Sequence, residues 1–527
     1  MKKIFLTSCM IVALGLTGCN SSGSKNDSAD SAKEAAANGM AEKEKTPERL
    51  PDTTFPSIDV IKYDIEEVEP TVSGQLESLD NLYAGSPSVM SFRNGPKRQG
   101  EFDGKFEQMP TKITVDWKYE TATQVPSKAQ SRWGGGTGWT GQPLYMKWDA
   151  ALQEKLKKAD VVNAEFNGNE VIFSSLCGRV YFLNPETGKP TREPVDVNNP
   201  IKGTSSIDPT LNGNMYVGQG ISSVRPFGHL VVDLFSNKVN YTFPEDKKAL
   251  RAWGAYDSSA IRVGQFLFRP AENGGLYKFI IEPGALKLHS VLRYKVNGEA
   301  PGLEASIAIY ANYGYIADNA GNVICVNLDN LKPVWYYDIG DDTDASPMVV
   351  VEDGKPYVYV GCEIDRTKRG YANFTKLDAI NGEIVWNIQV EGKRWDYDKK
   401  HFDGGFYASP LLGQGNCSDL IFTNVVKNLQ GQNGAFIAID RKSGKIVYEV
   451  PLKHYSWSSP VGSVTKSGDM VVFTCDGAGN VYIIDGKKGE ILATERVGMN
   501  FESSPVLMDK SIYIGSRTNG LFRISFS

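Results

Sequence analysis

One short pattern returns along most of this chain and constrains the fold more than any other feature. A β-prone run ends in Asp or Asn, Gly follows four residues later and, in the fullest copies, an aromatic residue follows eight residues later. The Asp or Asn can close a tight turn, and the Gly can adopt the positive φ that the turn needs. The pattern predicts hairpins whose aromatic residue packs between neighbouring sheets. Clear copies turn at Asn184, Asp378, Asp440 and Asp485, and weaker copies turn at Asp233, Ile280 and Asn327.

A second pattern lies between copies of the first, a pair of small residues followed by an apolar strand. Small side chains suit the inner strands of a ring of sheets, where the sheets converge on an axis. Consecutive turns lie roughly 45 to 62 residues apart, which is the length of one four-stranded propeller blade. The small pairs begin at Ser205, Ser258, Ala305, Ala345, Ala408, Ser458 and Ser503.

The number of turns predicts the number of blades. Seven turns are visible, and an eighth inner hairpin begins at residues 520–525, where the chain ends. Its missing strands can come from residues 114–119, 141–145 and 171–174, which would leave no free sheet edge. We therefore predict an all-β, eight-bladed β-propeller over residues 91–527, closed by N-terminal strands. A seven-bladed ring is the alternative, because the copy at Ile280 is degraded.

The N-terminus carries a targeting signal. Lys2 and Lys3 precede a short apolar run, and residues 16–19 read Leu-Thr-Gly-Cys, which resembles a bacterial lipobox. We expect residues 1–18 to be a signal peptide and Cys19 to carry the lipid anchor. Residues 19–52 are rich in Ser, Ala, Lys and Glu, which predicts a disordered tether. Residues 53–90 form an extension that can pack on the outside of the propeller.

Composition excludes two classes of protein. The net charge of -5 is small for 527 residues, whereas a nucleic-acid-binding protein would carry a basic face. Beyond Cys9 and Cys19, five cysteines remain with no CxxC spacing, so they form neither a zinc site nor a disulfide framework. One disulfide stays open as an alternative to five buried thiols.

The repeats and the segment Phe92-Arg-Asn-Gly-Pro-Lys-Arg-Gln-Gly100 resemble the PQQ-repeat, quinoprotein-like propeller family. The resemblance covers about residues 91–527. The family has two branches: quinoprotein dehydrogenases, which use PQQ with Ca²⁺, and non-catalytic lipoproteins such as the BamB scaffold of the outer-membrane assembly machinery. The adjacent cysteines typical of the enzymes are absent. The resemblance therefore implies a BamB-like protein without a cofactor, with insertions at residues 366–371 and 394–405 that depart from that branch.

The residue just before each small pair should lie near one mouth of the central channel. Carboxylates gathered there could hold a cation or carry raised pKa values, and a solvated polar rim is the alternative. Nearby Arg and Trp residues could hold a sugar, an anionic ring compound or a peptide strand, and ordinary packing between blades is the alternative. The mouth residues are Trp139, Thr204, Asp257, Glu304, Asp344, Tyr407, Trp457 and Glu502, and the flanking ones are Arg132, Trp133, Arg251, Trp253, Arg394 and Trp395.

Two further segments have open interpretations. The Gly-rich segment at residues 132–139 is either a flexible loop or a place where backbone approaches a ligand closely. His401 lies near Asp396, Asp398 and Asp403, which permits a metal site. No nucleophilic triad and no paired-histidine zinc motif is present in the sequence.

Three functions remain at this stage. The first is a non-enzymatic lipoprotein scaffold, anchored in the bacterial cell envelope, most naturally the outer membrane, which binds envelope proteins and no nucleic acid. The second is a quinoprotein-like oxidoreductase that uses PQQ and Ca²⁺ in an atypical site. The third is a lipoprotein that binds a glycan at the aromatic mouth. The residues favour the first.

Overall fold

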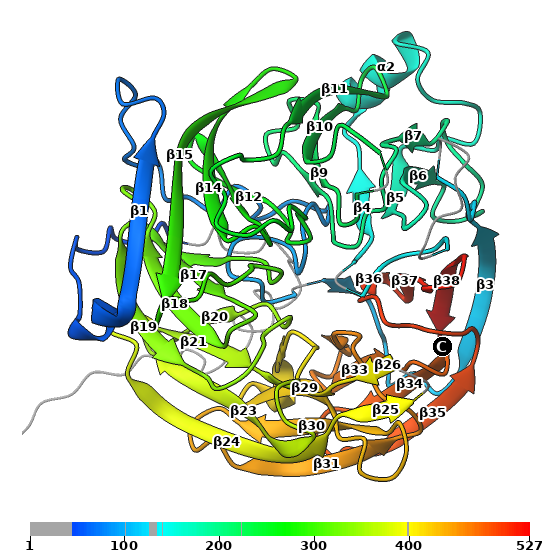
Figure 1. Cartoon of the computed structure of the whole chain (residues 1–527). Helices are drawn as coiled ribbons and strands as arrows, with labels where there is room; N and C mark the ends of the chain where they lie inside the picture. The colour runs from blue at the N-terminus through cyan, green and yellow to red at the C-terminus, as the bar shows by residue number, and fades with distance from the viewer. Residues whose placement is uncertain (1–44, 101, 126–133, 140, 223, 398–399) are drawn as a thin grey trace, which may run out of the picture. The chain divides into compact units, whose positions relative to one another are not determined.

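The computed structural model describes residues 45–527, with the exception of 101, 126–133, 140, 223 and 398–399. Within this part of the chain, eight sheets succeed one another around a central axis (Figure 1). The eight-bladed, all-β propeller predicted from the repeats is confirmed. The blade around Ile280 is complete, which rules out the seven-bladed alternative. In the described residues, no helix is long and apolar enough to cross a membrane.

Each blade pairs four antiparallel strands. Blade 1 comprises β4 (Leu144–Lys147), β5 (Asn169–Ser174), β6 (Arg179–Leu183) and β7 (Val195–Asp196), and blade 2 comprises β8 (Ser206–Ile207), β9 (Asn214–Gly218), β10 (His229–Asp233) and β11 (Lys238–Phe243). Blade 3 comprises β12 (Ile261–Val263), β13 (Phe266–Pro270), β14 (Gly275–Glu282) and β15 (Ala285–Val296), and blade 4 comprises β16 (Ala308–Tyr310), β17 (Tyr313–Ala317), β18 (Asn322–Asn327) and β19 (Pro333–Asp338). Blade 5 comprises β20 (Met348–Glu352), β21 (Lys355–Gly361), β23 (Arg369–Asp378) and β24 (Ile384–Lys393), and blade 6 comprises β28 (Leu411–Leu412), β29 (Leu420–Val426), β30 (Gly434–Asp440) and β31 (Ile446–Leu452). Blade 7 comprises β32 (Val461–Val464), β33 (Met470–Cys475), β34 (Asn480–Asp485) and β35 (Ile491–Arg496), and blade 8 comprises β36 (Val506–Asp509), β37 (Ser511–Gly515), β38 (Gly520–Phe526) and β3 (Ile113–Glu120).

A few elements lie outside this scheme. The helix α2 (Ala150–Lys158) joins β4 to β5, and the Asp149 side chain caps it by accepting from the Leu152 N–H. Two short 3-10 helices are η1 (Pro56–Val60) and η2 (Gly415–Cys417). The extra strands are β1 (Ile61–Glu67), β2 (Asp103–Gly104), β22 (Glu363–Ile364), β25 (Trp395–Tyr397), β26 (Lys400–Phe402) and β27 (Gly404–Gly405).

Blade 8 closes the ring with strands from both ends of the propeller. β3 pairs with β38 from Ile113↔Phe526 to Glu120↔Gly520, so the prediction for residues 114–119 is confirmed. The prediction that residues 141–145 and 171–174 also complete this blade is wrong. These residues fall in and beside β4 and β5, which pair with each other and begin blade 1. The reason is local, because the strand that leads to the Asn184 turn needs β5 as its neighbour.

The hairpin turns form as the sequence predicts, and each clear turn also receives an aromatic residue from the blade before it. Asp378 accepts a 2.8 Å hydrogen bond from the Ile380 N–H, and Gly382 has φ of 75°. The indole of Trp335 in blade 4 donates to the carbonyl of Ala379 at 3.0 Å. A Cβ on Gly382 would approach that indole to 2.7 Å, so the turn requires glycine twice over. Trp117, Trp386 and Tyr448 dock in the same way on Pro185, Arg441 and Gly486.

Hydrogen bonds between inner strands form a ring around the axis, which we call the serine ring. The Ser259 N–H donates to the Oγ of Ser306 at 2.8 Å, and the Ser306 N–H donates to Ser346 at 2.9 Å. The series continues blade by blade through Ser409, Ser459 and Ser504. A small side chain with an oxygen acceptor satisfies the neighbouring backbone N–H without widening the ring.

Residues 89–100 run across the inner strands and close one end of the channel. Arg93 donates to the carbonyls of Pro410 and Pro460, in blades 6 and 7. Arg98 donates to the carbonyls of Ser259 and Ile307, in blades 3 and 4. Both guanidinium groups are completely buried, and burial lowers the pKa of Arg93 to about 9 and that of Arg98 to about 10. One segment thus bonds to carbonyls from blades on opposite sides of the axis.

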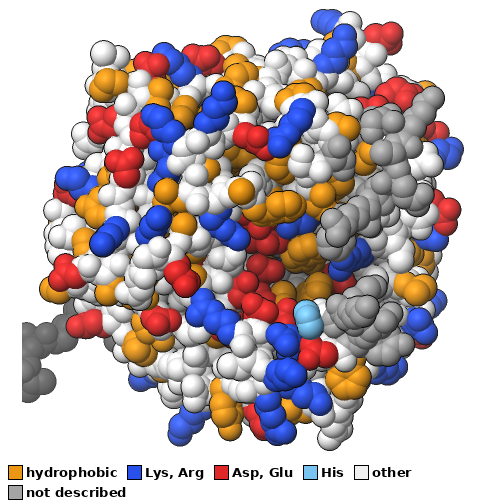
Figure 2. Space-filling view, in the orientation of Figure 1, with side chains coloured by type: hydrophobic (Ala, Val, Ile, Leu, Met, Phe, Trp, Pro, Cys, Tyr) orange, Lys and Arg blue, Asp and Glu red, His pale blue; other side chains and the backbone are white. Residues whose placement is uncertain are grey.

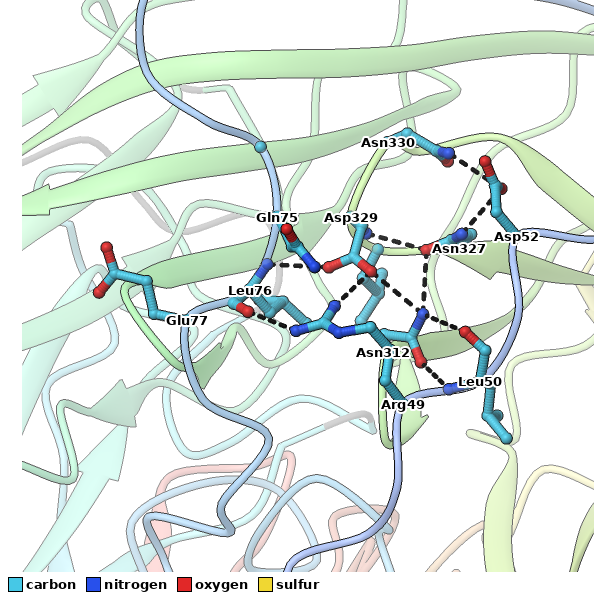
Figure 3. A network of polar contacts seen from close by, with 12 residues as sticks. Arg49, Leu50, Asp52, Gln75, Leu76, Glu77, Asn312, Asn327, Asp329 and Asn330 are labelled. Atoms are coloured by element: carbon cyan, nitrogen blue, oxygen red, sulfur yellow. Dashed lines mark hydrogen bonds and ion pairs between the residues drawn. The ribbon is translucent and has the colours of Figure 1, made fainter.

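The chain before the propeller is bound to blade 4 by the polar contacts that Figure 3 shows. Arg49 pairs with Asp329, the Leu50 N–H donates to Asn312, and Asp52 accepts from Asn327. Further on, β1 adds a fifth strand to blade 3 by pairing with β15. We expected a disordered tether over residues 19–52, but Arg49, Leu50 and Asp52 at its end contact blade 4. Composition alone could not show that their few polar groups meet complementary partners on blade 4.

We expect Trp335→Ala to lower the free energy of unfolding by about 3 to 5 kcal/mol, because it removes a fully buried indole and leaves a cavity between two blades. Urea denaturation measures this value. Tyr371→Ala is the control, since Tyr371 is 59% exposed, and it should change stability by less than about 0.5 kcal/mol. Equal losses in the two variants would contradict the docking role of Trp335.

Candidate active or binding cavity

A cavity of about 940 Å³ lies at one end of the channel. Figure 2 shows acidic side chains gathered in a hollow near the middle of this face. Beneath it, a narrow pocket on the axis is lined by ring serines, by Trp457 and by Phe92 of the segment that closes the other end. The walls come mainly from blades 4 to 8 and from the hairpin of β25 and β26. The charged residues that line the 940 Å³ cavity are Glu304, Asp342, Asp344, Glu363, Asp365, Asp403, Glu502, Arg496 and Arg517, and His401 and His454 line it as well.

One group of carboxylates in this region surrounds a lysine. The ammonium of Lys202 pairs with Asp257, with Glu272 at 3.1 Å and with Glu304 at 3.3 Å. It also lies 4.7 Å from the centre of the Trp139 ring, whose indole N–H donates to Glu304. Burial alone would lower the pKa of Lys202, but the three carboxylates raise it well above its usual value. Lys202 is therefore a buried cation that neutralises much of this group.

A second group, Asp342, Asp344 and Glu363, has carboxylate oxygens within 4.8 Å of one another. No ion pair joins these three to a Lys, Arg or His among the described residues. The Asp344 N–H donates to Glu363 at 3.1 Å. Burial, followed by the charges of Glu304 and Asp365, raises the pKa of Asp342 to about 8. Burial and neighbouring carboxylates also raise the pKa values of Asp344 and Glu363 well above their usual range.

Aromatic rings form the floor between the two groups. Tyr407 stacks on Trp457 with ring centres 4.7 Å apart and planes 22° apart. Trp139 meets Trp457 edge-on at 6.4 Å, and Tyr455 lies 5.2 Å from it. The Trp457 indole nitrogen is buried and has no acceptor within the described part of the chain. The cavity therefore combines flat apolar faces with an excess of negative charge.

Most residues expected at the mouth do line the cavity. These are Trp139, Glu304, Asp344, Tyr407, Trp457 and Glu502. Asp257 is 1% exposed and lies behind them on Lys202, and Thr204 accepts from the backbone of Gln142. Whether any of them binds a ligand stays a prediction.

The expected Arg and aromatic residues lie elsewhere. Arg251 donates to the carbonyl of Glu272, and Trp253 is 42% exposed. Arg394 holds Asp396 and the carbonyl of Asp365, and Trp395 begins the β25 strand. None of these four is among the cavity-lining residues. Arg132, Trp133 and Cys19 fall outside the described residues.

Two other expectations concern residues that the structure describes in part. A Cβ on Gly136 would lie 1.8 Å from the carbonyl oxygen of Ser516, so this glycine permits a close approach between two backbone segments. His401 bonds to Asp396 at 2.6 Å, and this pair is not part of either carboxylate group that could hold a metal ion. Asp398 is outside the described residues.

Several charged residues in or beside the cavity were not predicted from the sequence. Asp342 and Lys202 lie two residues before Asp344 and Thr204, so a period-two reading of the approach to each small pair could have found them. Glu363 and Asp365 have the same spacing in the segment between β21 and β23 of blade 5. No local signal marks Glu272, Arg496 or Arg517, which reach the site from separate blades.

Eight blades with Asp-x-x-x-Gly turns and docked aromatic residues define a β-propeller built from PQQ repeats. The family model described as outer membrane protein assembly factor BamB matches residues 295–526. No curated protein matches the chain.

Solved structures agree on the fold. Quinohemoprotein alcohol dehydrogenase from Comamonas testosteroni is 13% identical over 84% of this chain and 81% of its own, with a TM-score of 0.57. A europium-containing methanol dehydrogenase is 12% identical over 83% of this chain and 91% of its own, with a TM-score of 0.53. BamB from Moraxella catarrhalis is 14% identical over 79% and 98%, with a TM-score of 0.49. At these identities the likeness to the two dehydrogenases concerns the fold alone, and the BamB structure, with the lowest of the three TM-scores, adds nothing to it.

The raised pKa of Asp342 predicts how stability depends on pH. The folded carboxyl titrates near 8 and the unfolded one near 3.8, so the folded state holds the proton between these values. The free energy of unfolding should therefore fall as pH rises from about 4 to 8. Asp342→Asn removes this loss and should be more stable than the wild type at pH 8 by at least about 1.4 kcal/mol, the value of one pKa unit, but not at pH 4. Urea denaturation at both pH values measures it, and an equal pH slope in the two proteins would contradict it.

Proposed function

We propose that this protein is a lipid-anchored scaffold of the bacterial cell envelope that binds other proteins and does not convert a substrate. The match of residues 295–526 to a model described as an outer-membrane assembly factor carries the proposal. The Leu16-Thr17-Gly18-Cys19 sequence supports an anchor at Cys19, and the family description supports an outer-membrane location.

Two features of the propeller support a scaffold. The closed ring and the segment at residues 89–100 fix the blades relative to one another, which gives a rigid binding surface. The outer strands of blades 5 and 6 expose apolar side chains and pair with no further strand among the described residues. Ile384 is 55% exposed and Val447 is 52% exposed. Exposed apolar residues on adjacent strand edges are typical of surfaces that bind proteins.

The second candidate is a quinoprotein-like oxidoreductase, which the carboxylates and the stacked Tyr407 and Trp457 favour. The charge of the cavity does not fit PQQ, however. PQQ carries three carboxylates, and the lining holds seven carboxylates against two arginines. The ionised carboxylates would repel an anionic quinone, and protonation of Asp342, Asp344 and Glu363 would weaken that repulsion. Ca²⁺ would meet suitable oxygen ligands, but it does not account for the aromatic floor.

We expect Cys19→Ala to move the protein from the membrane fraction to the soluble envelope fraction and to abolish labelling with palmitate, because the acyl chains supply the membrane affinity. Cell fractionation and radiolabelling measure both effects. Membrane association that persists without label would contradict the anchor.

Removing the gene should reduce the abundance of β-barrel proteins in the outer membrane, as measured by quantitative mass spectrometry. Wild-type protein should restore it. Val447→Glu should restore it less well, because it places a charge on the exposed apolar edge. Asn240→Glu, on the exposed outer strand of blade 2, is the matched control and should restore it fully. Unchanged β-barrel abundance, with loss of a PQQ-dependent alcohol oxidation instead, would favour the second candidate.

A further inference from the structure

The contacts of Lys202 show how carboxylates and an indole beside the cavity hold one ammonium group. The Lys202 ammonium lies among three carboxylates and against the face of Trp139, at 4.7 Å from the ring centre. Its partners come from separate blades: Asp257 begins blade 3 and Glu304 begins blade 4. The ammonium of Lys202 thus stabilises the buried carboxylates, and it lies between them and an indole ring. Charged and aromatic groups reinforce each other on such a cation.

The neighbouring group repeats this arrangement without a basic side chain of its own. Asp342, Asp344 and Glu363 bring three carboxylates together, as around Lys202. The aromatic side chain beside them is Tyr407, which forms a hydrogen bond with Glu363 and stacks on Trp457. Within the described residues they form no ion pair, and the Oδ1 of Asp342 is buried without a hydrogen-bond donor. The Trp457 indole nitrogen nearby is also buried without an acceptor. These unmatched groups line the cavity and can meet a ligand there.

We propose that Asp342, Asp344 and Glu363 form a binding site for an ammonium or guanidinium group, carried into the cavity by an extended basic segment of a partner protein. The proposal rests on the scaffold function above, because it names the chemistry of the partner. The cationic group of the partner would lie among these three carboxylates as the Lys202 ammonium lies among those of the adjacent group.

The shape and chemistry of the cavity favour an organic cation over a metal ion. About 940 Å³ is far larger than a single ion needs and accommodates several residues of a peptide. A metal ion would use the oxygens but not the ring faces of Tyr407 and Trp457. A guanidinium group uses both, because its planar fork matches carboxylates while its face stacks on aromatic rings. The remaining acidic lining, which includes Asp365 and Asp403, extends the same preference toward the rim.

The test uses the full mature chain in detergent and follows tryptophan fluorescence, since Trp139 and Trp457 lie in the cavity. The probe is the peptide acetyl-Gly-Gly-Arg-Gly-Gly-amide. Its control replaces Arg with citrulline, which keeps the shape and removes the charge. We expect saturable binding of the Arg peptide and at least a roughly 10-fold weaker affinity for the citrulline peptide, because the charge-assisted hydrogen bonds are lost.

The decisive variant is Asp344→Asn with Glu363→Gln, which keeps the shape of the site and relieves repulsion, so the protein should fold. It should lose about 10-fold or more in affinity for the Arg peptide. The matched control is Glu391→Gln with Glu449→Gln, which removes the same charge from outer strands and should bind as the wild type does. Thermal melting of both variants checks the fold.

Several outcomes would overturn the proposal. They are equal binding of the Arg and citrulline peptides, no saturable binding, or unchanged binding by the decisive variant. Spermidine tests a free polyamine as the source of the cation, and binding of spermidine alone would exclude a protein partner. Ca²⁺ that displaces the peptide at micromolar concentration would assign the site to a metal ion. None of these outcomes bears on Cys19 anchoring or on β-barrel abundance, so a failure here is distinguishable from failure of the scaffold function.

Discussion

The serine ring is the constraint on which the rest of the structure depends. From blade 3 to blade 8, the backbone N–H of one serine donates to the side-chain oxygen of the serine in the next blade, as from Ser306 to Ser346, so these strands approach the axis to the distance that serine permits. A larger residue would force the blades apart, and an apolar one would leave a buried N–H without a partner. The narrow axis that results is closed below by Phe92 and opens above into the acidic cavity.

The same constraint explains the unusual charge of the cavity. The residue before each small pair has little freedom, because the following serine is fixed to the next blade. Acidic residues at these positions are therefore held close together by the backbone, and they cannot separate to reduce repulsion. Lys202 neutralises much of the charge of Asp257, Glu272 and Glu304, whereas burial and repulsion raise the carboxyl pKa values in the group of Asp342, Asp344 and Glu363. The backbone thus holds these carboxylates in place before any ion binds. Ion binding itself stays a prediction.

Much of the fold was predictable because its causes are local. The Asp378 turn, the glycine at Gly382 and the aromatic residue at Trp386 follow from spacing alone, and their repetition gave the number of blades. The assignment of residues 141–145 to blade 8 failed because any short apolar strand near the N-terminus could have served there. In the site, the mouth residues were predictable from their place before the small pairs. The neutralisation of Asp257 by Lys202 was not, since it joins different blades and leaves no sequence period.

The attachment of the N-terminal segment to blades 3 and 4 has a mechanical consequence. A pull from an anchor at Cys19 reaches the propeller first at the Arg49 and Leu50 contacts and then at β1, which is held to β15 from Ile61↔Val296 to Glu67↔Ser290. In an antiparallel pair the hydrogen bonds lie across the strands, so tension along β1 loads many of them together in shear. The load enters the side of the ring at blades 3 and 4, away from the seam in blade 8 where the two ends of the propeller meet.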